Sequence, residues 1–267
     1  MPKNRLKASL REGKAVSGPI MEEARTVGPV KMLALSGHDF LWFDTEHSML
    51  EWDTLLTLVQ YSLAVGITPL VRVTDLQYPL VARALDLGAQ GVIIPRVETR
   101  EEVERAVSYA KYLPLGRRGA GGRARYAYEA RGVGEAVEEA NAETMVIVQV
   151  ESREAVANLN GIASVPGLDV VCIGPQDLSI DLGVHGQFDH PTFIDTVKEI
   201  VAACSKHNIP VGMVSREAAS FRQWYDLGIR FLVCNSDGNY IVQGATRDVQ
   251  TLREITSGVT QAGDESG

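Results

Sequence analysis

Cysteine is scarce in this sequence, with three residues among 267, at positions 172, 204 and 234. The number is odd, the three are far apart, and each is surrounded by apolar residues. Buried thiols are therefore a better interpretation than a disulfide or a cysteine metal site, and we expect these side chains to carry no chemistry.

Basic residues are in deficit. Lysine and arginine number 26 against 34 aspartates and glutamates, which gives a formal net charge of −8. This charge would repel a phosphate backbone, so we expect no nucleic-acid partner. None of the lysines (positions 3, 7, 14, 31, 111, 198 and 206) falls in a predicted strand, which argues against an enzyme that forms an imine with its substrate.

Long apolar runs are missing. The first eighteen residues contain several charged side chains, which argues against a signal peptide, and no later run approaches the roughly 18 residues of a membrane span. With 45% hydrophobic and 22% charged residues, disorder is excluded. We expect a cytoplasmic protein without a membrane partner.

Linkers rich in proline or serine are absent as well, and the composition does not shift along the chain. The sequence therefore predicts one domain over 1–267, with an N-terminal extension to about residue 14 and a C-terminal tail over about 258–267.

Short apolar runs alternate with segments of helical period. The runs are continuous, as in parallel strands buried on both faces, and cover 15–20, 40–45, 68–73, 91–97, 145–150, 169–174, 209–214 and 230–234. The sequence predicts helices near 52–65, 78–88, 99–112, 152–164, 191–207, 216–227 and 239–257, and one within 21–36 that Gly28-Pro29 interrupts. Eight such units predict an α/β fold, a single (β/α)8 TIM barrel.

Two local features refine this prediction. Gly66, Gly88 and Gly228 each follow a helical segment and precede a strand, the usual place of a helix-ending glycine. The connection 113–144 is much longer than the others, and segments of this length are often functional.

In a parallel barrel the active site is built at the carboxyl ends of the strands. The residues to inspect are therefore those where an apolar run turns polar. They are Asp44, Glu46, His47, Arg72, Arg96, Gln149, Glu151, Gln176, Asp177, Asn235 and Asp237.

Glu151 and Asp177 follow consecutive predicted strands. Two carboxylates that converge in a partly desolvated site repel each other unless a proton or cation lies between them, and two oxygen ligands suit Mg²⁺ or Mn²⁺. The alternative is that each carboxylate caps the following helix, and Glu151-Ser152-Arg153-Glu154 does resemble a helix start. Spacing alone leaves both interpretations open.

His47 and Arg72 are the other candidates. Asp44 or Asp86 could accept a hydrogen bond from His47 and leave its second nitrogen free to act as a general base, although a packed or metal-bound histidine is equally compatible with the pattern. Arg72 lies inside an apolar strand, where a guanidinium needs an anionic partner or substrate. Arg96 could equally be part of the structure of the barrel mouth.

The chain resembles the HpcH/HpaI aldolases, or class II pyruvate aldolases, over about residues 40–240. The motifs that carry the resemblance are DTEH (44–47), PLVRV (69–73), ALDLGAQGVIIPRV (84–97), LPLGRRGAG (113–121), VQVES (148–152) and IGPQDLS (173–179). The resemblance implies a (β/α)8 barrel and a homo-oligomer, typically a hexamer (a trimer of dimers) whose last helix is swapped between neighbouring subunits.

The resemblance also implies roles for single residues. It places the base on His47, its aspartate partners on Asp44 and Asp86, the enolate-stabilising arginine on Arg72, and the metal carboxylates on Glu151 and Asp177. Gln149 matches a position near the substrate, and the backbone N–H groups around Gln176 and Asp177 match those that hold its carboxylate. The sequence departs from the pattern at Thr45, at Asn235 and around 18–37.

These residues predict a divalent-metal-dependent aldolase (Mg²⁺, Mn²⁺ or Co²⁺) that combines pyruvate or a related 2-oxo acid with an aldehyde, or cleaves the product. Oxaloacetate decarboxylation, a citrate-forming condensation, a citrate-lyase-β-type reaction on an acyl-CoA thioester and a non-catalytic 2-oxo-acid sensor are the alternatives. Arg117, Arg118, Arg123 and Arg125 lie in a glycine-rich segment. This segment is either a solvated loop or subunit contact, or it presents an arginine such as Arg118 to the acceptor aldehyde.

Overall fold

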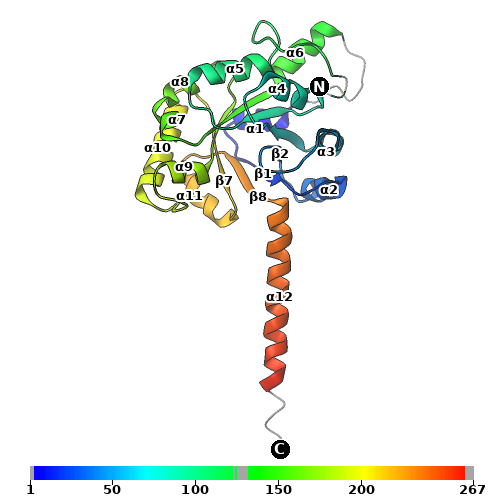
Figure 1. Ribbon diagram of the computed structural model, residues 1–267, viewed down its shortest axis with the longest axis vertical. Coiled ribbons are helices and arrows are strands. Elements are labelled where there is room, and N and C mark those ends of the chain that lie inside the picture. The colour runs from blue at the N-terminus through cyan, green and yellow to red at the C-terminus, as the bar shows by residue number, and fades with distance from the viewer. Residues whose placement is uncertain (1–2, 123, 125–131, 262–267) are drawn as a thin grey trace, which may run out of the picture.

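The computed structural model describes residues 3–122, 124 and 132–261. Eight strands form a closed barrel in chain order, and each neighbouring pair is parallel (Figure 1). The strands are β1 Val16–Met21, β2 Phe40–Asp44, β3 Thr68–Arg72, β4 Gly91–Ile94, β5 Met145–Val150, β6 Val170–Ile173, β7 Val211–Ser215 and β8 Phe231–Ser236. The predicted (β/α)8 TIM barrel is confirmed.

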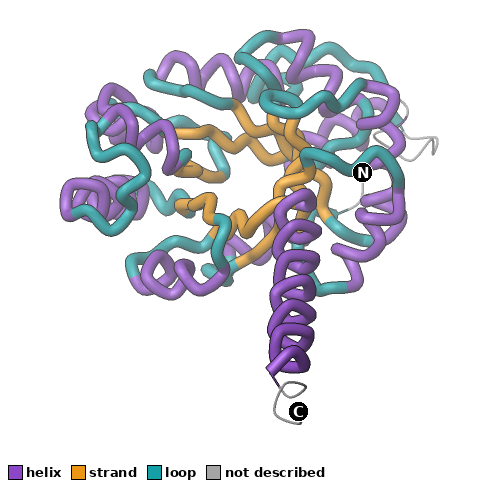
Figure 2. The backbone as a smooth tube through the Cα atoms, turned by 60° about the horizontal axis from the view of Figure 1, so that its bottom comes forward, coloured by secondary structure: helices purple, strands orange, loops and turns teal. Residues whose placement is uncertain are grey.

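Helices surround the strands (Figure 2). They are α1 Arg5–Arg11, α2 Val27–Leu35, α3 Trp52–Val65, α4 Tyr78–Asp86, α5 Arg100–Ala110, α6 Val133–Glu143, α7 Arg153–Ala157, α8 Leu159–Ala163, α9 Pro175–Asp181, α10 Pro191–Ser205, α11 Phe221–Asp226 and α12 Asp237–Gln261. The helices α1, α6 and α9 were not predicted, and the helix predicted over 152–164 is two short helices that meet at Asn158.

The glycine expectations have mixed outcomes. Gly66, Gly88 and Gly228 follow helices with φ of 82°, 112° and 109°, the left-handed conformation that glycine adopts without strain. Gly28-Pro29 does not interrupt a helix, which corrects that prediction. The two residues lie in the first turn of α2, where the missing N–H of proline costs no hydrogen bond.

Helix α1 closes the amino-terminal end of the barrel. Its Leu6 and Leu10 belong to the apolar cluster inside the barrel, where Phe40 stacks on Phe231 with ring centroids 4.5 Å apart. Asn4, the N-cap of α1, donates a hydrogen bond to the carbonyl oxygen of Gln90, directly before β4. Within the N-terminal extension that the sequence predicts, α1 thus packs into the core.

Helix α12 leaves the barrel instead of packing against it (Figures 1 and 2). It continues to Gln261, so the predicted boundary of the C-terminal tail at 258 is too early. Several of its apolar side chains are exposed, namely Ile241, Val242, Val249, Leu252 and Ile255. Within the described part of the chain, no helix has both the length and the apolar character required to cross a membrane.

Candidate active site

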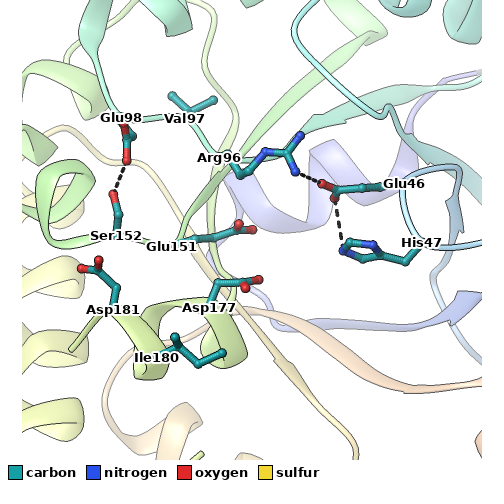
Figure 3. Close-up of a pocket in the computed structure, with 10 residues that line it drawn as sticks. All are labelled: Glu46, His47, Arg96, Val97, Glu98, Glu151, Ser152, Asp177, Ile180 and Asp181. Carbon is teal, nitrogen blue, oxygen red and sulfur yellow. Dashed lines mark hydrogen bonds and ion pairs between the residues drawn. The ribbon is translucent and has the colours of Figure 1, made fainter. Parts of the chain in front are cut away.

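A cavity of about 440 Å³ lies at the carboxyl ends of the strands. Its lining consists mostly of polar side chains from the loops after β2, β4, β5 and β6 (Figure 3), and comprises Glu46, His47, Arg96, Val97, Glu98, Glu151, Ser152, Asp177, Ile180 and Asp181. Several of the polar residues that the sequence places after its apolar runs therefore do come together.

Arg72 lies at the base of this region, and its side chain is only 10% exposed. Asp44 is its neighbour in the strand register and accepts two hydrogen bonds, from Nε at 2.8 Å and from Nη2 at 2.6 Å. The third nitrogen, Nη1, lies 3.3 Å from Oε1 of Gln149 and 3.2 Å from Oε2 of Glu46. Asp44 thus fixes one edge of the guanidinium and leaves Nη1 with the longer contacts.

The acidic groups around Arg72 raise its pKa by more than its burial lowers it. Burial disfavours the cation, but Asp44, followed by Glu46 and Glu151, holds the pKa of Arg72 above its usual value. The buried guanidinium has the anionic partner that the sequence requires, and this partner is Asp44.

Asp44 is therefore not placed as the partner of His47, which corrects one of the two pairings expected from the sequence. Besides Arg72, its carboxylate accepts the backbone N–H of Glu46 at 2.9 Å, and the carboxylate is fully buried. The imidazole of His47 is 64% exposed, and its Nε2 lies 3.8 Å from Oε2 of Glu46. The acidic neighbour of His47 in this structure is Glu46.

Asp86 is also not beside His47 within this chain. Helix α4 follows β3 and runs back toward the amino ends of the strands, so its last residue lies at the opposite end of the barrel. There Asp86 pairs with Arg118 at 2.5 Å, and the Arg118 side chain is 1% exposed.

Arg118 consequently does not face the cavity, which corrects its predicted contact with the acceptor. The segment after α5 connects a helix to β5, and such connections lie at the amino ends of the strands, away from the active-site end. Arg117 is exposed in the same segment. Arg123 and Arg125 lie outside the described residues.

Glu151 and Asp177 do approach each other, from the end of β5 and the first turn of α9 (Figure 3). Burial, then Asp177 and Glu46, raise the pKa of Glu151 to about 7. Gly174 makes room for this carboxylate, because a Cβ at Gly174 would lie 2.7 Å from Oε1 of Glu151. Two carboxylates held this close favour a cation or a proton between them.

The helix-cap interpretation of Glu151 is wrong. The cap of α7 is Ser152, whose Oγ accepts the backbone N–H of Ala155 at 3.1 Å. Among the described residues, no group of three or more histidine, cysteine, aspartate or glutamate side chains is arranged to hold a metal. A metal here would have two protein carboxylates as ligands and would take its other ligands from substrate and water.

The two glutamines differ in exposure. Gln149 is buried inside the barrel, in contact with Arg72, whereas Gln176 is exposed in the first turn of α9. Gln149 therefore lies beside Arg72, and its predicted place near the substrate stays a prediction.

The sequence assigns no role to Glu46, and to Arg96 only a possible part in the structure of the barrel mouth, but both residues have prominent contacts in the structure. Glu46 contacts Arg72, Arg96 and His47, and Arg96 has a φ of 51°, in the left-handed region that a non-glycine residue rarely adopts. The signal was present, because both residues follow apolar runs in DTEH and IPRV.

The departures near the ends of β1 and β8 are structural. Asn235 has a φ of 67°, a conformation that asparagine tolerates better than most side chains. Asp237 accepts the backbone N–H groups of Glu22, Glu23 and Ala24 at 2.7 to 3.2 Å. The first and last active-site loops are thus fastened together.

Comparisons with known proteins agree with this geometry. The model of the HpcH/HpaI aldolase/citrate lyase family matches residues 28–243. A hydroxypyruvate/pyruvate aldolase of Sagittula stellata is 34% identical over 241 residues, 90% of this chain and 94% of that protein. The crystal structure of an HpcH/HpaI aldolase from Desulfitobacterium hafniense DCB-2 has a TM-score of 0.90 at 31% identity and covers 93% of this chain and 96% of that chain. The citrate synthase SbnG gives 0.83 at 30% identity, over 94% of this chain and 98% of that one.

Proposed function

Since the chain belongs to the HpcH/HpaI aldolase/citrate lyase family and is a carbon–carbon lyase of its class II aldolase type, we propose that it reversibly forms and cleaves 4-hydroxy-2-oxo acids. The 2-oxo acid partner is pyruvate or a close relative such as hydroxypyruvate. The other partner is an aldehyde.

The observation that carries this proposal is the orientation of Arg72. Asp44 binds Nε and Nη2, so Nη1 is the nitrogen nearest the cavity-lining Glu46. A buried cation held in one orientation stabilises an oxyanion without reorganising during the reaction. When C3 of the 2-oxo acid gives up a proton to water or to the imidazole of His47, or when the C3–C4 bond of the aldol breaks and its electron pair passes to C3, negative charge develops on the oxygen at C2, and Nη1 donates to that oxygen.

The residues present fit a divalent cation. Glu151 and Asp177 would supply hard oxygen ligands. Burial, and then the charge of Asp177, raises the pKa of Glu151, and a cation between the two carboxylates would offset their repulsion. Mg²⁺, Mn²⁺ or Co²⁺ bound there would act as a Lewis acid on the carboxylate and keto oxygens of the substrate. The backbone N–H groups of Gln176 and Asp177, in the first turn of α9, would bind the substrate carboxylate.

His47 moves the proton at the other end of the reaction, directly or through a water. In cleavage its imidazole takes the proton of the C4 hydroxyl as the C3–C4 electron pair passes to the enolate, and in synthesis it returns that proton to the aldehyde oxygen. Its exposure in the cavity lining leaves it accessible to the acceptor, while Gln149 helps to hold Arg72.

The test is aldol formation from pyruvate and glycolaldehyde. We expect product with Mg²⁺, Mn²⁺ or Co²⁺, none in excess EDTA, and recovery when the metal is returned. Full activity in EDTA, or a protein–pyruvate adduct trapped by borohydride, would contradict the proposal. The second result would point to imine formation, which the strands do not support, because none of them contains a lysine.

A second candidate function has one observation in its favour. The citrate synthase SbnG has the same fold at 30% identity. A condensation onto the keto group of oxaloacetate would use the same enolate and differ only in the electrophile. Incubation with pyruvate, oxaloacetate and metal distinguishes the reactions, because condensation yields a tricarboxylic acid, decarboxylation releases CO₂, and a 2-oxo-acid sensor gives neither.

For the assembly we propose a homo-hexamer, a trimer of dimers, in which α12 packs against a neighbouring subunit. The support is the projecting helix itself, because a 25-residue helix with exposed apolar side chains is stable in water only when it is covered.

A further inference from the structure

The two carboxylate oxygens of Glu46 have different partners. Oε1 lies 2.7 Å from Nη1 of Arg96. Oε2 lies 3.2 Å from Nη1 of Arg72 and 3.8 Å from Nε2 of His47. One oxygen is therefore anchored to Arg96 at the barrel mouth, while the other faces His47 (Figure 3). The second oxygen also contacts Arg72, so it touches both side chains to which the proposed reaction assigns the chemistry.

Arg96 is held in place for this contact. Its Nη2 donates to the carbonyl oxygen of Thr74 at 2.9 Å, so the guanidinium connects the loop after β3 to Glu46. Its φ of 51° is a strained conformation for an arginine, and such strain persists where surrounding contacts over-determine it. The Glu46 side chain is 8% exposed, so its charge is little screened by water.

From these contacts we propose that Glu46, anchored by Arg96, is a positioning residue that fixes Arg72 and His47 relative to one another. The proposal rests on the proposed aldolase function. Asp44 fixes one edge of Arg72, and Glu46 fixes the direction of Nη1. Oε2 of Glu46 stabilises the imidazolium that His47 becomes when it takes the proton of the C4 hydroxyl in cleavage. In synthesis His47 returns that proton to the aldehyde oxygen.

The principal test is Glu46→Gln. The amide keeps one oxygen for Arg96 but turns an N–H donor toward the Nη1 donor of Arg72 and removes the negative charge beside His47. With Mg²⁺ present we expect kcat for aldol cleavage to fall by on the order of 10-fold or more, and KM to change by less than about 3-fold, because orientation rather than binding is lost. Glu104→Gln is the matched control. Glu104 lies on α5, outside the cavity lining, where its Oε1 pairs with Nε of Arg100 at 2.7 Å, and we expect a change within about 2-fold.

A double-mutant cycle separates the role of Arg96 from direct substrate contact. If Arg96 acts through Glu46, Arg96→Met lowers kcat in the wild type but causes little further loss in Glu46→Gln, and Arg96→Lys recovers part of the rate. If Arg96 binds substrate itself, Arg96→Met lowers the rate by the same factor in both backgrounds, which overturns the anchoring part of the proposal.

Two further measurements keep the result interpretable. Calorimetric titration with oxalate and Mg²⁺ reports binding without turnover, and we expect similar affinity in the wild type and Glu46→Gln. Urea unfolding reports whether each variant folds, and if Glu46→Gln does not, the exposed Arg96 carries the test. Equal rates in Glu46→Gln and Glu104→Gln would refute the positioning role alone. A wild type without any metal-dependent reaction of pyruvate would refute the proposed function, and the positioning role with it.

Discussion

Arg72 carries its charge inside the barrel because Asp44 binds it through two hydrogen bonds. The sequence indicates that Arg72 needs an anion but not which one, since Asp44, Glu46 and the substrate are all compatible with an arginine in an apolar strand. The register decides, because parallel pairing of β2 with β3 places Asp44 opposite Arg72. Asp44 therefore binds Arg72, although it lies only three positions before the candidate base His47, whose acidic neighbour is Glu46.

Asp44→Ala should destabilise the protein strongly. It leaves the Arg72 guanidinium without its buried partner, and removal of one partner from a buried ion pair costs about 3–5 kcal/mol. Urea unfolding of the two proteins measures the difference. A cost below about 1 kcal/mol would mean that Arg72 finds another anion or reaches water.

His47→Ala should affect the activity and not the stability. The side chain is 64% exposed, so its loss should leave the urea midpoint unchanged, while aldol cleavage should slow by about 10²–10⁴-fold, as removal of a general base does. Steady-state cleavage kinetics of a 4-hydroxy-2-oxo acid test this. Normal turnover in the variant would assign the proton transfer to another group.

At the scale of elements, much of the barrel can be predicted because strands buried on both faces leave continuous apolar runs. The helices α9 and α6 are harder to predict, because α9 is short and α6 has few apolar residues. The direction in which each helix runs can also be derived from the fold, and this direction removes Asp86 and Arg118 from the active-site end of this chain's barrel. Asp86 ends a helix that runs back from β3, and Arg118 follows one that runs back from β4, so both lie at the amino-terminal end. What cannot be derived from one sequence is the side-chain network of Glu46, which depends on an arginine in a left-handed conformation.

The buried Lys111, at the end of α5, leads to a prediction about how the free energy of unfolding depends on pH. Lys111 follows α5, and its Nζ donates to the carbonyl oxygens of Asn141 and Thr144. Burial, then the nearby Lys7, lower the pKa of Lys111 from 10.5 to about 7. Between these values the unfolded chain binds a proton that the native chain lacks, so the free energy of unfolding should increase with pH.

Between about pH 7.5 and 8.5 the three cysteines oppose this effect, because their pKa is about 8.5 in the unfolded chain and higher in the folded one, but their contribution is the same in the wild type and in Lys111→Met. There the Lys111 contribution should approach about 1.4 kcal/mol per pH unit, and Lys111→Met should lack it, while Lys7 still donates to the carbonyl oxygen of Thr144. Urea unfolding across the window measures both slopes. Equal slopes would show that Lys111 stays charged in the native state.

At the scale of the whole molecule, the barrel and α12 differ in how their apolar side chains are covered. The barrel buries its apolar clusters within one chain, whereas α12 exposes Leu252 and Ile255 to solvent. A hexamer in which neighbouring chains cover this helix resolves the difference, and the wild type should have the mass of six 29.0 kDa chains in light scattering after size exclusion.

Leu252→Glu and Ile255→Glu together should shift that mass to smaller species, because the substitutions bring charge into an apolar contact. Gln250→Glu, on another face of the helix, is the control and should leave the mass unchanged. A monomeric wild type, or a double variant that keeps the wild-type mass, would contradict the assembly.

The central claim is that the Arg72, Glu151 and Asp177 site makes an enolate from a 2-oxo acid. Proton NMR of pyruvate in D₂O, with enzyme and Mg²⁺ but no aldehyde, tests it without any assumption about the acceptor. The methyl signal should disappear as deuterium enters, stop disappearing in excess EDTA, and exchange on the order of 10²-fold more slowly with Arg72→Lys, which keeps the charge but loses the planar fork. Exchange that persists in EDTA, or pyruvate binding without exchange, would contradict the account.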